Sequence, residues 1–166
     1  MKKISASFLV LLALIFLTNC EKDDICVDGD TPLLIIRFLD ADNPTEFQDV
    51  SGLEVRGLLP DGTPLDVIAN ASSDSIAIPL QIGESGTTFI LSQNPTPTDE
   101  TTVNLDTLRF TYGTSEIFIS RACGFVANYD SLDNELTADG DNWIQSIEIV
   151  TPLVENSVSA HVQIFH

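Results

Sequence analysis

The chain has 166 residues, with 7 basic residues (Lys and Arg) against 25 acidic residues (Asp and Glu), and a formal net charge of −18 at pH 7. Such an acidic surface repels phosphate groups, which excludes nucleic-acid binding and argues against adsorption of the protein surface on anionic lipid. Hydrophobic residues make up 43% of the chain, which is enough for a packed core and excludes an acidic disordered tail.

The N-terminal segment has the three parts of a secretory signal peptide. Met1 to Lys3 is basic, residues 8–17 are an apolar run of ten, and Cys20 stands where cleavage is expected. The run is too short to cross a bilayer, which takes about 20 apolar residues. Residues 1–20 resemble the signal of bacterial lipoproteins. This resemblance implies that residues 1–19 are removed and that Cys20 is acylated, with chains such as palmitate that anchor the protein in a membrane.

An acidic segment follows this cysteine, and we expect residues 20–32 to form the lipidated terminus and a solvated tether. Lys22, Asp23 and Asp24 resemble the short export signal of Bacteroidota lipoproteins. The resemblance implies a protein of the outer membrane that faces the cell exterior. The alternative is a protein that faces the periplasm, in which these charges are only a spacer.

Cys26 and Cys123 remain as a pair once Cys20 carries lipid, because the chain has three cysteines. In an oxidising compartment, an even pair favours a disulfide. The bond would close a loop of about 98 residues, worth about 4–5 kcal/mol in the chain-entropy model. The alternative is two buried free thiols. A zinc site does not fit, because no Cys-x-x-Cys occurs and only His161 and His166 could add imidazole.

Residues 33–166 are predicted to fold as one antiparallel β-sandwich, immunoglobulin-like or similar. Short runs rich in β-branched and aromatic residues alternate with clusters of Gly, Pro, Asn and Asp, and about eight to ten strands are expected. Residues 33–39 suit a central strand that is covered on both faces. Residues 53–59 form a strand that ends at the turn Pro60-Asp61-Gly62.

Later strands follow the same pattern. Residues 76–82 alternate as an edge strand because they contain Pro79, and we expect a hairpin with residues 87–93. A strand over residues 115–126 joins the preceding one through Gly113. Residues 129–142 are predicted to be a long acidic loop. Two final strands, in residues 143–150 and 157–165, form a closing pair.

Three sequence blocks carry a family resemblance. CEKDDIC begins at Cys20, SRACGF at Ser120 and WIQSIEI at Trp143. Together they resemble a family of uncharacterised Bacteroidota lipoproteins over essentially the whole chain. The resemblance implies secretion, a lipid anchor and one small β-rich domain. It supplies no activity and no catalytic residues.

The residues needed for catalysis are sparse. A nucleophilic mechanism needs a serine or cysteine with a histidine base, and the only histidines are His161, predicted on the polar face of its strand, and the terminal His166. No Gly-x-Ser-x-Gly, phosphate-binding loop or His-Glu-x-x-His occurs. The sequence therefore predicts that the chain is not an enzyme. A glycan-active enzyme that uses paired carboxylates is the less favoured alternative.

Calcium binding is the alternative function from another class. Asp133, Glu135, Asp139 and Asp141 lie within ten residues and offer the carboxylate oxygens that calcium prefers. However, the residue order is not that of an EF-hand. An exposed connection made of turn-forming residues explains the same composition.

We therefore predict a non-catalytic binding or structural module without a cofactor, which holds a surface protein or a glycan. Tyr112, Tyr129 and Trp143 are candidate contacts, although core packing is the simpler interpretation because their neighbours are apolar. Asp130-Ser131-Leu132 resembles the acceptor motif for O-linked glycans in Bacteroidota, which makes Ser131 a candidate modification site.

Overall fold

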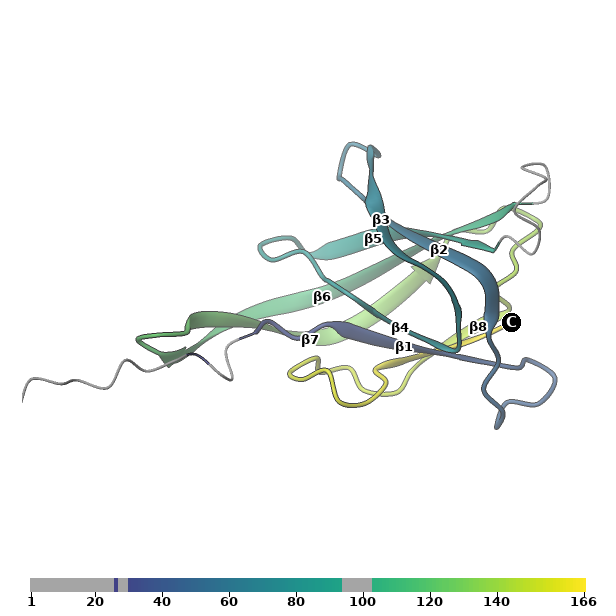
Figure 1. Cartoon of the computed structure of the whole chain (residues 1–166). Helices are drawn as coiled ribbons and strands as arrows, with labels where there is room; N and C mark the ends of the chain where they lie inside the picture. Colours follow the sequence, from purple (N-terminus) through teal and green to yellow (C-terminus); the bar gives the residue numbers. More distant parts are fainter. Residues whose placement is uncertain (1–25, 27–29, 94–102) are drawn as a thin grey trace, which may run out of the picture.

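The computed structural model describes Cys26, residues 30–93 and residues 103–166. The predicted signal peptide, Cys20 and the export residues Lys22, Asp23 and Asp24 lie outside these residues. The described chain forms nine strands and no helix (Figure 1). The strands are β1 (Leu34–Leu39), β2 (Val50–Leu58), β3 (Pro64–Ser73), β4 (Ser75–Ile78), β5 (Gly86–Gln93), β6 (Asn104–Ser120), β7 (Gly124–Leu136), β8 (Ser146–Ile149) and β9 (Val162–Phe165).

The strands form two sheets that pack as a sandwich, which confirms the predicted all-β class. One sheet has four strands in the order β4-β1-β9-β8, and the other has five in the order β3-β2-β5-β6-β7. Neighbouring strands are antiparallel except β1 and β9, which run parallel. In β1, Leu34, Ile36 and Phe38 are fully buried, while Ile35 and Arg37 are half-buried. The prediction that both faces of this strand are covered is therefore wrong in part, because the side chains of one face are fully buried, whereas Ile35 and Arg37 on the other are only half-buried.

The core lies between the sheets and is built by alternating residues, because successive side chains of a strand point to opposite faces. Tyr112, Tyr129 and Trp143 belong to this core, so the packing interpretation of these aromatic residues is confirmed. The other fully buried members include Leu34, Ile36, Phe38, Val50, Leu53, Val55, Ile78, Leu91, Leu108, Phe110, Val154, Val162 and Ile164.

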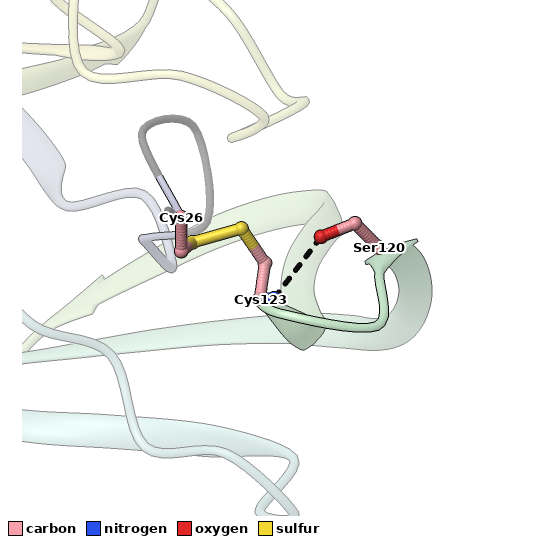
Figure 2. Close-up of a disulfide and its surroundings, with 3 residues drawn as sticks. All are labelled: Cys26, Ser120 and Cys123. Atoms are coloured by element: carbon pink, nitrogen blue, oxygen red, sulfur yellow. Dashed lines mark hydrogen bonds between the residues drawn. A yellow bond between two sulfur atoms is a disulfide. The ribbon is translucent and has the colours of Figure 1, made fainter. Parts of the chain in front are cut away.

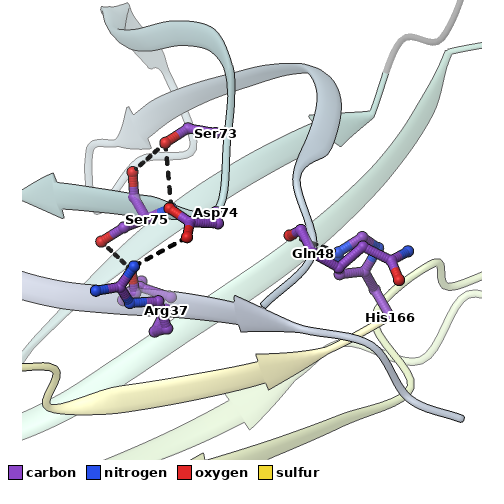
Figure 3. A network of polar contacts seen from close by, with 7 residues as sticks. Arg37, Gln48, Ser73, Asp74, Ser75 and His166 are labelled. Carbon is purple, nitrogen blue, oxygen red and sulfur yellow. Dashed lines mark hydrogen bonds and ion pairs between the residues drawn. The ribbon is translucent and has the colours of Figure 1, made fainter. Parts of the chain in front are cut away.

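The chain crosses from one sheet to the other between β3 and β4, with only Asp74 between the two strands. Arg37 of β1 holds this corner by an ion pair with Asp74, 3.0 Å between Nη1 and Oδ2 (Figure 3). The backbone N–H of Phe38 donates to the carbonyl of Asp74 at 2.8 Å. After β9, the ring of His166 lies beside Gln48, whose backbone carbonyl oxygen is 3.4 Å from Nε2.

A second crossing follows β4, so the predicted hairpin between residues 76–82 and 87–93 is wrong: β4 pairs with β1, whereas β5 pairs with β2 and β6. Pro79 ends β4, which is an edge strand as predicted. Two buried hydroxyl groups hold the crossing: Tyr129 donates to the carbonyl of Leu80 at 3.1 Å, and Tyr112 to that of Gln81 at 2.9 Å.

The acidic loop predicted for residues 129–142 is also wrong over its first half, because β7 continues to Leu136. Its acidic residues stand on a strand that pairs with β6, so the composition signals an exposed strand face there. Strand β3 was missed, since its exposed edge position leaves little hydrophobic alternation to detect. The closing pair of β8 and β9 is confirmed.

Candidate functional site

The hairpin of β6 and β7 changes character along its length. From Asp106 to Tyr112, every second residue of β6 is buried in the core. From Thr114 to Ile119, every residue is exposed. Figure 1 shows that this part of the hairpin projects beyond the four-stranded sheet, which therefore does not cover it. We call residues 114–126 the hairpin end.

The hairpin end carries large apolar side chains in contact with solvent. The exposed fraction is 66% for Phe125, 56% for Phe118, 44% for Ile117 and 40% for Ile119. Phe118 and Phe125 are register partners, and their rings meet edge to face with centroids 5.3 Å apart. Since Ile117 and Ile119 alternate with Phe118 along β6, both faces of the hairpin end are apolar. Large exposed apolar side chains that gather at one end of a hairpin often mark a binding site.

A disulfide joins the hairpin end to the beginning of the described chain. The Sγ atoms of Cys26 and Cys123 lie 2.00 Å apart, at bonding distance, so the predicted pair is brought together (Figure 2). Cys123 sits in the turn between β6 and β7, where its N–H donates to Ser120 Oγ at 3.1 Å. Nearby, the N–H of Ala127 donates to Thr31 Oγ1 at 3.4 Å. Cys26 and Thr31, both before β1 in the sequence, therefore contact the β6–β7 hairpin.

The hairpin end is neutral in a strongly acidic chain. Glu116 and Arg121 are the charged residues between positions 114 and 126, one of each sign, whereas the chain as a whole carries −18. The charges of the hairpin end itself therefore add no net acidic repulsion of a partner or a membrane.

The predicted calcium ligands are not gathered into a site. Asp133 and Glu135 are exposed on β7, whereas Asp139 and Asp141 lie in the following loop. In that loop, Asp139 Oδ1 accepts from the N–H of Asp141 at 3.3 Å, which is a turn contact. No three His, Cys, Asp or Glu side chains in the described residues are grouped so that they could hold a metal ion.

Ser131 lies on β7 and is exposed, as a glycan acceptor must be. Its φ angle of 54° makes it the one non-glycine residue with positive φ among the described residues. Its Oγ donates to Asp130 Oδ1 at 3.0 Å. The strained backbone coincides with a register shift between β6 and β7 at Thr111 and Gly113. Glycosylation of Ser131 stays a prediction.

The two histidines are part of the packing. His161 is 2% exposed and precedes β9, so its predicted place on a polar face is wrong. Its Nδ1 accepts from the N–H of Ile35 at 3.1 Å, and burial lowers the pKa of the imidazole. The ring of His166 packs against Phe38 and Trp143. In the described part of the chain, neither ring is hydrogen-bonded to a serine or cysteine side chain.

Asp106 is a buried carboxyl that the sequence reasoning missed, although its alternation with Leu108 and Phe110 places it on the inward face. It is 0% exposed and accepts from the backbone N–H groups of Ile144 at 2.9 Å and Trp143 at 3.4 Å. Burial raises its pKa, against the lowering effect of these two hydrogen bonds. Asp106 therefore fastens the segment before β8 onto β6.

A shallow pocket of about 230 Å³ lies where the turn after β2 meets the β4–β5 connection. Its charged side chains are Glu84 and Arg109, one of each sign, so the pocket does not select strongly for either an anion or a cation. The remaining lining residues are Leu58, Leu59, Pro60, Gly62, Gln81, Gly86 and Thr88.

Among known proteins, the chain matches a family model described as a family of unknown function (DUF6452) over residues 53–166. The match covers more than half of the chain, from β2 to the C-terminus, so the protein belongs to this family. No curated protein and no solved structure matches the chain. The part of the chain that the structure describes contains no helix long and apolar enough to cross a membrane.

Proposed function

We propose that this member of DUF6452 is a lipoprotein of the Bacteroidota outer membrane, acylated on Cys20 and facing the cell exterior. The observation that carries the proposal is the apolar run of residues 8–17, followed within three residues by Cys20 and then directly by Glu21, Lys22, Asp23 and Asp24. The disulfide supports it, because such bonds persist in oxidising compartments outside the cytoplasm.

The sandwich acts as a non-catalytic binding or structural module that presents a surface on a rigid scaffold. Two observations support this role. Both histidines are engaged in packing or backbone contacts, and the most distinctive exposed surface, the hairpin end, is apolar rather than a constellation of reactive groups. An exposed apolar surface suits binding better than chemistry.

The lipid anchor is tested by mass spectrometry of the N-terminal peptide, released from the purified full-length protein. We expect a diacylated or triacylated Cys20 and recovery of the protein in the membrane fraction. The matched variant Cys20→Ala should lose the acyl mass and leave the membrane fraction. An unmodified cysteine, or wild-type protein that still carries residues 1–19, would contradict the proposal.

The orientation is tested separately by protease treatment of intact cells. The wild type should be digested, whereas a variant with Lys22, Asp23 and Asp24 all changed to alanine should be protected. Protection of both proteins, together with a periplasmic control, would place the protein on the periplasmic face and leave the anchor in place.

The module works without a cofactor in this proposal. Calcium provides the direct check, because a ligand that binds only the folded state raises the melting temperature. We expect no change in the melting temperature between millimolar calcium and a chelator. A calcium-dependent rise that disappears in Asp139→Asn with Asp141→Asn would show that the acidic loop binds the ion after all.

A further inference from the structure

We propose that the hairpin end docks on the surface of the same bilayer that holds the lipid anchor. The surface consists of Ile117, Phe118, Ile119 and Phe125, and the Cys26–Cys123 disulfide sets its position. This inference rests on acylation of Cys20, as proposed above. It adds a second, non-covalent membrane contact and an orientation for the sandwich.

The first argument is reach. Cys26 is fixed by its disulfide to the turn between β6 and β7, and five residues separate it from Cys20. Six residue steps of extended chain span at most about 22 Å. An acylated Cys20 lies at the level of the lipid headgroups. The turn at Cys123 is therefore held near the membrane surface, because the path of covalent bonds from Cys20 through the Cys26–Cys123 disulfide is short.

The second argument is the chemistry of the surface held there. Phe125 and Phe118 are more than half exposed and lie together as an aromatic pair. Ile117 and Ile119 extend the apolar character to the other face of the hairpin. Apolar side chains gain free energy when they leave water for the boundary between headgroups and acyl chains, at roughly 25 cal/mol per Å² of area buried. The interfacial region of a bilayer is therefore a favourable environment for these side chains.

The third argument is charge. The acidic body disfavours adsorption on anionic lipid, but the hairpin end balances Glu116 with Arg121 and is neutral. The contact is therefore apolar rather than electrostatic. We expect it on zwitterionic lipid and expect little dependence on salt.

The sequence between Cys20 and Cys26 offers little apolar material that could cover the hairpin end in place of a membrane. Between Cys20 and Cys26 the chain reads EKDDI, with four charged residues and one apolar residue. Once residues 1–19 are removed, no apolar run remains on this side of the disulfide. A second copy of the chain is the main competing occupant, and the experiment separates it from the bilayer.

The experiment uses the full-length protein purified with its lipid and reconstituted into phosphatidylcholine vesicles. A matched set of vesicles carries bromine on the acyl chains, which quenches nearby tryptophan fluorescence. The reporter variant is Phe125→Trp. The control variant is Phe47→Trp, at a phenylalanine of similar exposure, 60%, in the β1–β2 connection at the opposite end of the sandwich (Figure 1). The wild type gives the baseline, because its single tryptophan, Trp143, is buried.

We expect the bromolipid to quench the fluorescence added by Phe125→Trp and to leave that added by Phe47→Trp unchanged. If both variants float with the vesicles and neither is quenched, docking is wrong and the anchor stands. Equal quenching of both would also overturn docking at this end. If the protein carries no acyl chain and does not float, the anchor fails and docking fails with it.

Two further measurements keep the test decisive. Hydrogen exchange of the wild type should slow at residues 114–126 on vesicles, relative to Cys20→Ala in solution, and this needs no tryptophan variant. Unchanged exchange would contradict docking. A dimer mass for Cys20→Ala, with the Phe125→Trp emission already blue-shifted without lipid, would show that a second copy covers the surface and would overturn the proposal.

Discussion

The two halves of the β6–β7 hairpin differ although the same two strands form both. In the inner half, the opposite sheet covers one face, and Leu108, Phe110 and Tyr112 become core. In the outer half, no sheet lies opposite, and Ile117, Phe118 and Phe125 stay exposed. Similar hydrophobic residues are thus buried in one half and exposed in the other, because burial depends on whether the opposite sheet covers them. The inner half contributes stability, and the outer half is available for binding.

The largest expected effect comes from comparing two phenylalanines of the same strand. Phe110→Ala removes a side chain that is 0% exposed, so it should lower the free energy of unfolding by about 3–5 kcal/mol. Phe118→Ala removes one that is 56% exposed, together with its ring contact to Phe125, and should cost about 0.5–1.5 kcal/mol. Urea unfolding of the Cys20→Ala protein measures both. Equal losses would mean that the outer half is also packed.

The disulfide is expected to stabilise the whole sandwich rather than the hairpin end alone. It spans 97 residues of sequence, so its loss frees most of the unfolded chain, and Cys26→Ser with Cys123→Ser should cost about 2–4 kcal/mol. The loss should appear in global unfolding by urea. A variant with unchanged unfolding, in which only residues 114–126 exchange hydrogen faster, would show that the bond acts locally.

The third prediction concerns the contribution of the buried Asp106 carboxylate to the stability of the inner half. Asp106→Ala leaves the N–H groups of Trp143 and Ile144 without their acceptor, which should cost about 1–3 kcal/mol at pH 7. Glu116→Ala, at an exposed position of the outer half, is the matched control and should change stability by less than about 0.5 kcal/mol.

The difference in unfolding free energy between the wild type and Asp106→Ala should depend on pH, and the sign of this dependence can be predicted. Burial raises the pKa of Asp106, so the native state binds a proton more tightly than the unfolded state. Stability from this group therefore increases as the pH falls from 7 toward the ordinary range of aspartate. The advantage of the wild type over Asp106→Ala should grow in that direction. An advantage that shrinks would mean that the two N–H donors outweigh burial.

The smallest effect is expected at the boundary between the halves. Ser131 has a positive φ, which glycine adopts without strain, so Ser131→Gly should raise the free energy of unfolding by up to about 1 kcal/mol. Ser115→Gly, in the exposed part of β6 with ordinary φ, should instead lower it by about 0.5–1 kcal/mol. Thermal unfolding compares the two, and a loss in both would indicate that Ser131 is not strained.

Much of this architecture follows from local pattern. Alternation and turn residues predicted β1, β2 and the closing pair of β8 and β9. The strand predicted over residues 115–126 is wrong in its extent, because β6 runs through Gly113 to Ser120, the chain turns at residues 121–123, and Gly124 begins β7. The same reasoning failed at β3, where Leu65, Val67 and Ile68 are all partly exposed at a sheet edge and show little alternation. It also failed at Asp133 and Glu135, because acidic residues on the solvent face of a strand look like a loop.

In the candidate site, too, one feature could be predicted from the sequence and another could not. The cysteine pair could be anticipated by counting, since Cys20 lies in the predicted lipoprotein signal and two cysteines remain. The apolar surface around Phe118 and Phe125 could not, because both residues were assigned to a single strand over residues 115–126, whereas the turn at residues 121–123 makes them partners on β6 and β7. Local pattern cannot tell whether an apolar strand residue has a partner across the sandwich.

The sequence by itself determined the class of the fold, the strand periodicity, the acidic character and the pair of cysteines, because these depend on residue type and spacing along the chain. Only the tertiary structure decided which strands share a sheet, that β4 and β5 separate, that β1 and β9 run parallel, and that residues 114–119 project beyond the four-stranded sheet and stay exposed. These features depend on contacts between residues far apart in the chain. Packing between two surfaces stabilises these features, and the residue pattern of one surface does not specify which other surface packs against it.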